Sequence, residues 1–435
     1  MVSSVAMSSE QARATRSIWP LTALLTACFT LSYVDRHVIG LLVDPIKAAL
    51  SLSDTQIGLI QGLSFSLFYV AASLPLARLS DRGNRPRIMS ACIAVWSLMT
   101  MLCGLATSFW QLMSARIGVA VSEAGLPPAA LTMMADSFDA KRLARATSIF
   151  MLAPFLGGGI ALLGGGALYG AIGEWSWIDS IGLGGLERWQ LVFILVGAPG
   201  LLVAAVVLLL AEPRISRAAA ATKKQPFSEL FSFLRENWRF YAAYMLAIAL
   251  MTLLLNAFVS WLPAAMMRAH GIDQQTVGAW FGPIFLIAGS AGTLSAGLII
   301  GRSENDVVGR TLRYMRWSVA VALPAAAFGP VVGSFELQLA FIAVALFVIS
   351  SVVGLSTLPL QFVAPSHMRA QSIAVLGLVS ALFGTGLGPI VVGLLSDSFQ
   401  FARHPLSLSL ALVGATAIAG AFAMLTYVSR RHSRA

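Results

Sequence analysis

Long apolar runs constrain this chain more than any other feature of its sequence. Each has about 20 residues, the length an α-helix needs to cross the hydrocarbon core of a bilayer. Charged residues make up 11% of the 435 residues, whereas soluble domains contain about 25%. We therefore expect an all-α membrane protein with twelve transmembrane helices. The expected spans are 18–43, 56–77, 88–107, 109–134, 144–168, 190–211, 240–266, 275–300, 315–332, 335–362, 370–395 and 404–428.

The 29 basic residues indicate how the chain is threaded through the membrane. Of these, 23 fall in the terminal tails and in alternate loops, and two lie inside spans. The remaining four, Lys47, Arg188, Arg268 and Arg403, fall in the opposite loops. By the positive-inside rule, both termini are expected in the cytoplasm. This alternation accounts for the net charge of +10, so no nucleic-acid partner is expected.

Two halves of six spans are expected on either side of a polar linker. The expected parts are a cytoplasmic tail (1–17), a six-helix bundle (18–211), the linker (212–239), a second six-helix bundle (240–428) and a second cytoplasmic tail (429–435). The linker contains an amphipathic stretch that we expect to lie on the membrane surface. Its apolar residues are Phe227, Leu230, Phe231, Leu234 and Trp238.

A weak internal repeat supports the division into halves. The motif Arg-Ala-x-Ser-Ile begins at Arg145 and again at Arg369, 224 residues later. Symmetry at about half the chain length is typical of transporters built from parallel repeats.

Four ionisable residues lie inside expected spans. They are Asp35 and Arg36 in the first span, and Arg116 and Glu123 in the fourth. A charge at the bilayer centre costs roughly 3 kcal/mol on insertion scales, and such residues normally mark a substrate or proton path. The sequence therefore predicts a secondary transporter.

The spacing of these charges indicates how they are used. Arg116 and Glu123 are nearly two helical turns apart on one face, too far apart to pair directly. Asp35 and Arg36 are adjacent on one helix and do not face each other. Each charge must then find a partner across a helix interface. A substrate anion that engages an arginine would free a carboxylate to bind a proton, although a purely structural ion-pair network is the alternative.

We therefore assign proton coupling to Asp35 and Glu123, with a transmembrane proton gradient as energy source and no cofactor. The residues expected to bind substrate are Tyr33, Arg36, Gln61, Tyr69, Arg116, Asn256, Trp261, Phe347 and Gln361. The expected partners are a small amphipathic or organic anion, protons and membrane lipids, and we expect a monomer.

Other classes of function have little support in the sequence. Cys28, Cys92 and Cys103 lack metal-ligand spacing, the five histidines are scattered, and no Gly-rich phosphate loop or nucleophile elbow occurs. We therefore expect no metal site and no enzyme. A receptor or scaffold that keeps the fold without transporting stays open.

The loop between the second and third spans, residues 77–87, resembles the signature cytoplasmic loop of the major facilitator superfamily, with Ala77 in place of the usual first glycine. In that loop an aspartate at a helix end and several arginines lock the two halves together, through ion pairs and the positive end of a neighbouring helix. The resemblance implies a cytoplasmic gate formed by Asp81, Arg82, Arg85 and Arg145.

A closer resemblance covers residues 20–212. The motifs that carry it are Tyr-x-Asp-Arg at 33–36, Leu-Val-Asp-Pro-Ile-Lys at 42–47, Ser-Asp-Thr-Gln-Ile-Gly at 53–58, Arg-Ile-Gly at 116–118 and Ser-Glu-Ala at 122–124. Together they resemble bacterial members of the Spinster-like branch of that superfamily. The resemblance implies the major facilitator fold of two pseudo-symmetric six-helix bundles, the bacterial cytoplasmic membrane, and alternating-access transport of a lysophospholipid or sphingoid-phosphate-like cargo.

Two other transport functions stay open. An Asp-Arg pair in the first span with Arg and Glu in the fourth also occurs in the anion:cation symporter branch, so a proton-coupled symporter of a small organic acid is one alternative. A multidrug-type exporter is the other.

Overall fold

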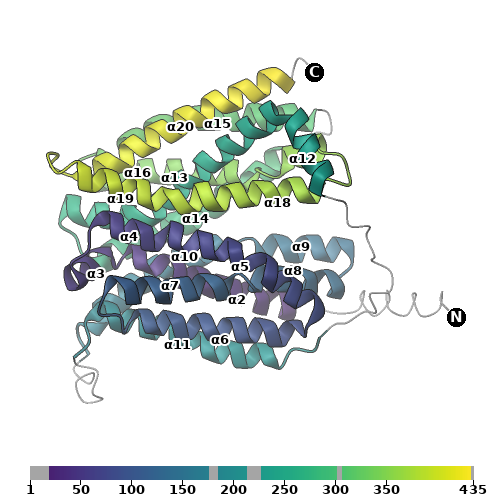
Figure 1. Cartoon of the computed structure of the whole chain (residues 1–435). Helices are drawn as coiled ribbons and strands as arrows, with labels where there is room; N and C mark the ends of the chain where they lie inside the picture. The colour runs from purple at the N-terminus through teal and green to yellow at the C-terminus, as the bar shows by residue number, and fades with distance from the viewer. Residues whose placement is uncertain (1–18, 176–184, 213–226, 301–305, 433–435) are drawn as a thin grey trace. The chain divides into compact units, whose positions relative to one another are not determined.

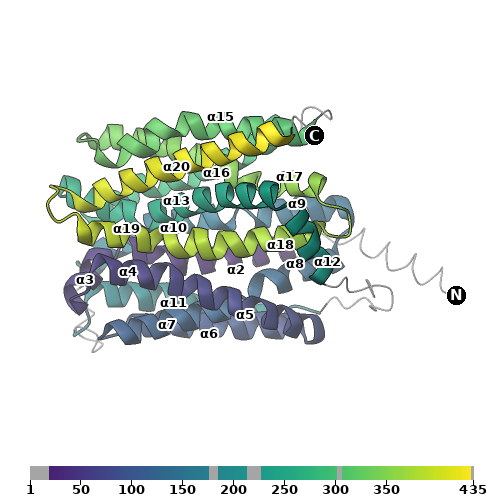
Figure 2. The same ribbon diagram turned by 45° about the horizontal axis from the view of Figure 1, so that its top comes forward.

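The computed structural model describes residues 19–175, 185–212, 227–300 and 306–432. These residues fold into helices joined by short turns, and no strand occurs in these ranges (Figures 1 and 2). Within them, ten helical segments are long and apolar enough to cross a membrane. The expected all-α membrane fold is confirmed.

Two of the twelve expected spans, 18–43 and 315–332, are not among these ten segments. They correspond to helices α2 (Trp19–His37) and α15 (Val307–Phe328). Charged residues lower the mean hydropathy of both helices, since α2 carries Asp35 and Arg36 and α15 carries three arginines. The count of twelve spans stays a prediction.

The N-terminal tail 1–17, linker residues 213–226 and the loop at 301–305 lie outside the described residues. Most of the amphipathic stretch of the linker forms a helix, α12 (Phe227–Glu236), whereas its last apolar residue, Trp238, begins the next helix. On α12, Leu230 is buried and Phe231 is 70% exposed. The helix thus exposes an apolar side chain, and its position on the membrane surface stays a prediction.

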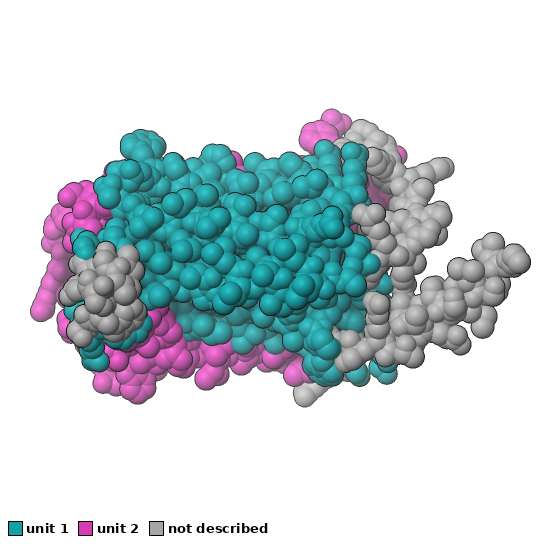
Figure 3. All heavy atoms as spheres, turned by 90° about the horizontal axis from the view of Figure 1, so that it is seen from below, with its two compact units in different colours: residues 1–36, 68–161, 172–223 teal, residues 37–67, 162–171, 224–435 magenta. Residues whose placement is uncertain are grey.

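The described chain divides into two compact units, coloured separately in Figure 3. Unit 1 comprises residues 1–36, 68–161 and 172–223. Its helices are α2 up to Arg36, α5 (Leu63–Arg82) from Phe68, α6 (Arg85–Cys103), α7 (Phe109–Glu123), α8 (Leu126–Ser137), α9 (Ala140–Phe150), the first part of α10 (Ala153–Ile172) and α11 (Arg188–Leu208). Helix α6 packs against both α7 and α11 (Figure 1).

Local sequence signals determine where two helices of unit 1 begin and how closely two others pack. The side chains of Asn84 and Ser108 cap the N-termini of α6 and α7 by accepting a main-chain N–H three residues later. A Cβ at Gly157 of α10 would meet the carbonyl of Thr30 and the side chain of Tyr33 on α2. Glycine at that position therefore lets α10 approach the helix that carries Asp35 and Arg36.

Unit 2 comprises residues 37–67, 162–171 and 224–435. Its elements are η1 (Val38–Gly40), α3 (Val43–Leu50), α4 (Asp54–Gln61), part of α10, α12, α13 (Trp238–His270), α14 (Gln274–Ile300), α15, η3 (Gly329–Val331), α16 (Phe335–Gly354), α17 (Leu358–Val363), α18 (Arg369–Val379), the π-helical η4 (Ser380–Gly386), α19 (Leu387–Ser398) and α20 (Pro405–His432). Helix α13 packs against α20, α14 against α16, and α4 against α19.

The pairing of α4 with α19 depends on glycine. A Cβ at Gly58 would meet the carbonyl of Pro389, and one at Gly393 would meet the carbonyl of Asp54. The two backbones therefore touch directly. Residues 37–67 thus cluster with the C-terminal half of the chain, although they follow α2 in the sequence. The expected bundle boundaries, 18–211 and 240–428, stay a prediction.

Candidate functional site

The four charges expected at membrane depth lie together in unit 1. The Arg36 guanidinium on α2 pairs with the Glu123 carboxylate on α7, with 2.5 Å between Nη2 and Oε2. Arg116 Nη1 donates to the main-chain carbonyl of Asp35 at 3.0 Å. These contacts confirm that the charges find their partners across a helix interface.

The cluster is buried. Asp35, Arg116 and Glu123 are 1%, 0% and 2% exposed. The hydroxyl of Thr100 on α6 donates to Asp35 Oδ2 at 3.2 Å, but Asp35 Oδ1 and Glu123 Oε1 have no hydrogen-bond partner among the described residues. A buried anionic oxygen without a donor is costly, and protonation of the carboxylate removes the negative charge. Each carboxylate therefore has an atom that can accept a proton.

Two tyrosines lie around Arg36 in unit 1. Its Cζ is 4.6 Å from the ring centroid of Tyr33 and 5.3 Å from that of Tyr69. Both distances are within the range of cation–π attraction. Arg36 thus contacts one carboxylate and two aromatic faces, while 15% of its side chain stays exposed. Tyr33 and Tyr69, expected to bind substrate, do lie at the cluster.

Thr100 is the member of this cluster that the sequence did not reveal. It is fully buried in the middle of the third expected span. A polar residue at membrane depth is a signal, but a weak one, because threonine in a helix also bonds to its own backbone. Within the described ranges, no group of three or more His, Cys, Asp or Glu side chains is placed to hold a metal ion.

Two aromatic residues expected to bind substrate lie in unit 2. Trp261 on α13 is fully buried, and its Nε1 donates to the Pro389 carbonyl at 2.8 Å. Phe347 on α16 lines a largely apolar cavity of about 1200 Å³ between α14 and α16. Trp261 thus links α13 to α19, whereas Phe347 lines a cavity, and the role of both in substrate binding stays a prediction.

Three amides expected to bind substrate are also in unit 2. Gln61, at the end of α4, is buried, and its Nε2 has no partner among the described residues. Asn256 is half-buried and donates to the Thr252 carbonyl at 2.8 Å. Gln361 on α17 is exposed. Their roles likewise stay predictions.

The expected cytoplasmic gate residues belong to unit 1. Asp81 and Arg82 are exposed at the end of α5, and Arg145 is exposed on α9. Arg85 is buried and pairs with Asp136 at 2.7 Å and with Glu212 at 2.5 Å. Arg85 therefore ties α6 to the ends of α8 and α11, whereas the lock through Asp81 stays a prediction.

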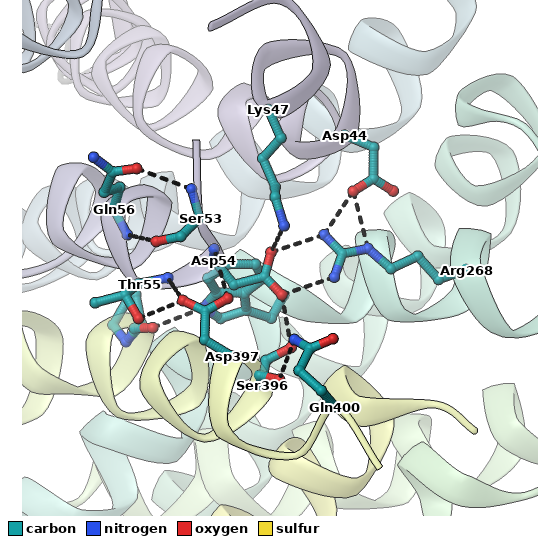
Figure 4. Close-up of polar contacts among 12 residues, drawn as sticks. Asp44, Lys47, Ser53, Asp54, Thr55, Gln56, Arg268, Ser396, Asp397 and Gln400 are labelled. Carbon is teal, nitrogen blue, oxygen red and sulfur yellow. Dashed lines mark hydrogen bonds and ion pairs between the residues drawn. The ribbon is translucent and has the colours of Figure 1, made fainter. Parts of the chain in front are cut away.

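A second set of charges, which the sequence did not reveal, lies in unit 2 (Figure 4). Arg268 Nη2, at the end of α13, contacts Asp44 Oδ1 at 2.6 Å, and its Nη1 contacts Asp54 Oδ2 at 2.9 Å. Lys47 also pairs with Asp54. We call Asp44, Lys47, Asp54, Arg268 and Asp397 the Arg268 network.

Asp397 joins this network through the N-terminus of α4. A capping box between Ser53 and Gln56 begins that helix. The main-chain N–H groups of Asp54 and Thr55 then donate to the Asp397 carboxylate at 3.1 and 2.8 Å, where the helix dipole favours a negative charge. The network therefore fixes α3 and α4 to α13 and α19. The sequence showed charges near these helix ends, but not which ones pair.

Comparison with known proteins identifies the family. The model of the Major Facilitator Superfamily matches residues 25–389. The chain belongs to the Major Facilitator Superfamily. This superfamily consists of transporters, so the chain is a multi-pass membrane transporter.

The chain is also similar to individual superfamily members. It is 32% identical over 391 residues to an MFS-type efflux pump of Mycolicibacterium smegmatis, covering 88% of this chain and 85% of the pump. It is 27% identical over 422 residues to the sphingosine-1-phosphate transporter SPNS2 of Danio rerio, covering 88% and 77%. A bacterial homolog of the human lysosomal transporter Spinster, solved inward-facing and unoccupied, superposes with a TM-score of 0.76 and 28% identity over 94% of both chains. The resemblance to the Spinster-like branch is confirmed.

Proposed function

We propose that this protein is a proton-coupled secondary transporter that moves an amphipathic organic anion by alternating access. One observation carries the proposal: two arginines and two carboxylates form one buried cluster, in which each carboxylate keeps an oxygen without a partner among the described residues. A cluster built only for stability would be expected to satisfy both oxygens.

The cluster suggests how an anion and a proton are coupled. Arg36 is bound to Glu123, and Arg116 is bound to the Asp35 carbonyl. An anion that binds either guanidinium competes with these partners, because a guanidinium donates bidentately to carboxylate or phosphate. A buried carboxylate gains a proton more readily when an anion neutralises the arginine beside it, which is Arg36 for Glu123 and Arg116 for Asp35. Anion binding and proton binding at Asp35 or Glu123 would therefore favour each other.

The chemistry around Arg36 supports an amphipathic cargo. Its guanidinium suits a phosphate headgroup, and Tyr33 and Tyr69 add apolar surface next to it. Similarity to a sphingosine-1-phosphate transporter supports the same class of molecule. We therefore infer a lysophospholipid or sphingoid-phosphate-like cargo.

A multidrug-type exporter is the second candidate. Similarity to an MFS-type efflux pump over 88% of the chain favours it. An exporter of uncharged or cationic drugs would not need Arg116, whereas the proposed anion transporter does.

We further infer that the protein works as a monomer, without a cofactor, in the bacterial cytoplasmic membrane. Both termini are then cytoplasmic. The distribution of basic residues over alternate loops supports this orientation.

Uptake into proteoliposomes under an imposed pH gradient tests the proposal. Labelled lysophosphatidate, a small dicarboxylate and a cationic dye should be compared, with each gradient collapsed by a protonophore as control. We expect gradient-dependent movement of lysophosphatidate alone. Movement of the dicarboxylate alone would indicate the organic-acid symporter, and movement of the dye alone would indicate the drug exporter.

A further inference from the structure

A small polar cavity lies beside the Arg268 network in unit 2. It has a volume of about 290 Å³, and its lining includes both carboxylates and basic or polar side chains: Asp54, Asp397, Lys47, Arg268, Arg403, His404 and Ser407. A second cavity of about 360 Å³ shares Arg403, His404 and Ser407. Three of the four basic residues that the sequence places in loops opposite the tails, Lys47, Arg268 and Arg403, thus line one cavity.

Among the described residues, two of these three cations have a carboxylate partner and the third has none. Lys47 and Arg268 pair with carboxylates of the Arg268 network. The Asp397 carboxylate accepts from the start of α4. Arg403 is exposed and forms no ion pair with any described residue. The cavity therefore has one positive charge available to a ligand.

Ser407 supplies an independent sign of a ligand. Its side chain is 3% exposed, and its Oγ has no hydrogen-bond partner among the described residues. A buried hydroxyl without a partner costs about 1 to 3 kcal/mol. Ser407 also lines both cavities, so a ligand there can relieve this cost.

The start of helix α20 adds main-chain donors. The chain enters α20 at Pro405, and the Leu408 N–H bonds to the His404 carbonyl. The N–H groups of Leu406 and Ser407 precede that bond, and such first-turn amides lack intrahelical acceptors. The N-terminus of a helix also carries partial positive charge. The residues that supply these donors and this partial charge line the same cavity as Arg403.

We propose that this cavity is a second anion site, which binds a phosphate group through the Arg403 guanidinium, the Ser407 hydroxyl and the first turn of α20. The cavity is large enough, since a water molecule takes up only about 30 Å³ of liquid volume. The site is built from unit 2 residues alone, so it does not depend on the cluster of Arg36 and Arg116. The phosphate can belong to a lipid headgroup or be a free ion.

Calorimetric titration of the full-length protein with inorganic phosphate tests the site. The titration is done in the wild type and in Arg116→Ala, which lacks one arginine of the central cluster and so separates the two sites. Arg403→Gln should weaken phosphate binding by roughly tenfold or more, because hydrogen bonds to charged groups contribute about 1.5 to 3 kcal/mol. Ser407→Ala should weaken it several-fold. Arg235→Gln removes the same charge from an exposed position on α12 and should leave binding unchanged.

A parallel titration with short-chain lysophosphatidate and lysophosphatidylcholine separates the two sources of phosphate. If Arg403→Gln weakens lysophosphatidate binding as well, the ligand is a lipid phosphate monoester. If it weakens only inorganic phosphate binding, the ligand is the free ion. Equal phosphate affinity in Arg403→Gln, Ser407→Ala and Arg235→Gln would overturn the site, and the proposed transport function would be unaffected.

Discussion

Arg36 and Glu123 are 87 positions apart in the sequence and form an ion pair in the structure, with 2.5 Å between Nη2 and Oε2. The pair joins α2 to α7 inside unit 1. Removing one member of a buried pair leaves an uncompensated charge. Any ligand that separates the two must therefore supply a substitute partner or a proton.

Arg116→Ala should weaken binding of an anionic cargo by about 2 to 5 kcal/mol. This is the range for loss of one partner from a desolvated charge pair, here the pair of Arg116 with the bound anion. Arg116 is fully buried and donates to the Asp35 carbonyl. Binding of radiolabelled lysophosphatidate by scintillation proximity measures the effect. Arg116→Lys keeps the charge without the planar fork and should show an intermediate loss. Equal affinities of wild type and Arg116→Ala would rule out anion binding by this residue.

Arg268→Gln should loosen the contact of residues 37–67 with α13. Arg268 neutralises both Asp44 and Asp54, so its removal leaves Asp54 with one cation, Lys47, and the hydrogen bond from the Ser396 hydroxyl. Spin labels on cysteines at Ala49 of α3 and Ala269 of α13, in a background without the native cysteines, report the distance between these two helices. We expect a longer, broader distribution in Arg268→Gln, with Arg235→Gln as control. An unchanged distribution would mean that the Arg268 network does not hold this segment.

Gly58→Ala should disrupt the packing of α4 on α19. The new Cβ would meet main-chain atoms of Pro389 and Ile390, which cannot move independently of their helix. We expect a lower midpoint of thermal unfolding in detergent. Gly377→Ala is the matched control, because nothing lies within 4 Å of a Cβ at that position of α18. Equal midpoints for the two variants would contradict close backbone contact between α4 and α19.

Arg85→Gln should destabilise unit 1 by about 3 kcal/mol, the lower end of the range for breaking a buried ion pair, because Asp136 is partly exposed to solvent. The change leaves Asp136 and Glu212 without their arginine. The midpoint of thermal unfolding in detergent reports this loss of stability. Arg87→Gln, at an exposed position on the same helix, should have little effect. If both variants unfolded at the same temperature, Arg85 would not stabilise these helix ends.

Much of the fold and the central cluster could be predicted because both depend on strong local signals. Apolar runs predict membrane helices, and the cost of a buried charge singles out Asp35, Arg36, Arg116 and Glu123. Helical periodicity also predicts that these charges pair between helices. Thr100 was missed because threonine is common in membrane helices for local reasons.

The Arg268 network could not be predicted for a different reason. Asp44, Lys47 and Asp54 lie near Arg268 only because residues 37–67 cluster with α13 and α19. That association depends on the close approach of Gly58 and Gly393 to the opposite backbones. A single sequence shows such glycines but not which helix lies against them.

Accumulation of labelled lysophosphatidate in proteoliposomes, driven only by an imposed pH gradient, tests proton coupling most directly. Wild type, Glu123→Gln, Asp35→Asn and the double variant should be compared, with Glu236→Gln at an exposed position on α12 as control. The amides keep the shape of each side chain but cannot titrate in this range. We predict that at least one single variant and the double variant lose accumulation above equilibrium while retaining exchange, and that the control accumulates cargo like the wild type. Undiminished accumulation in both single variants and in the double variant would contradict proton coupling through Asp35 and Glu123.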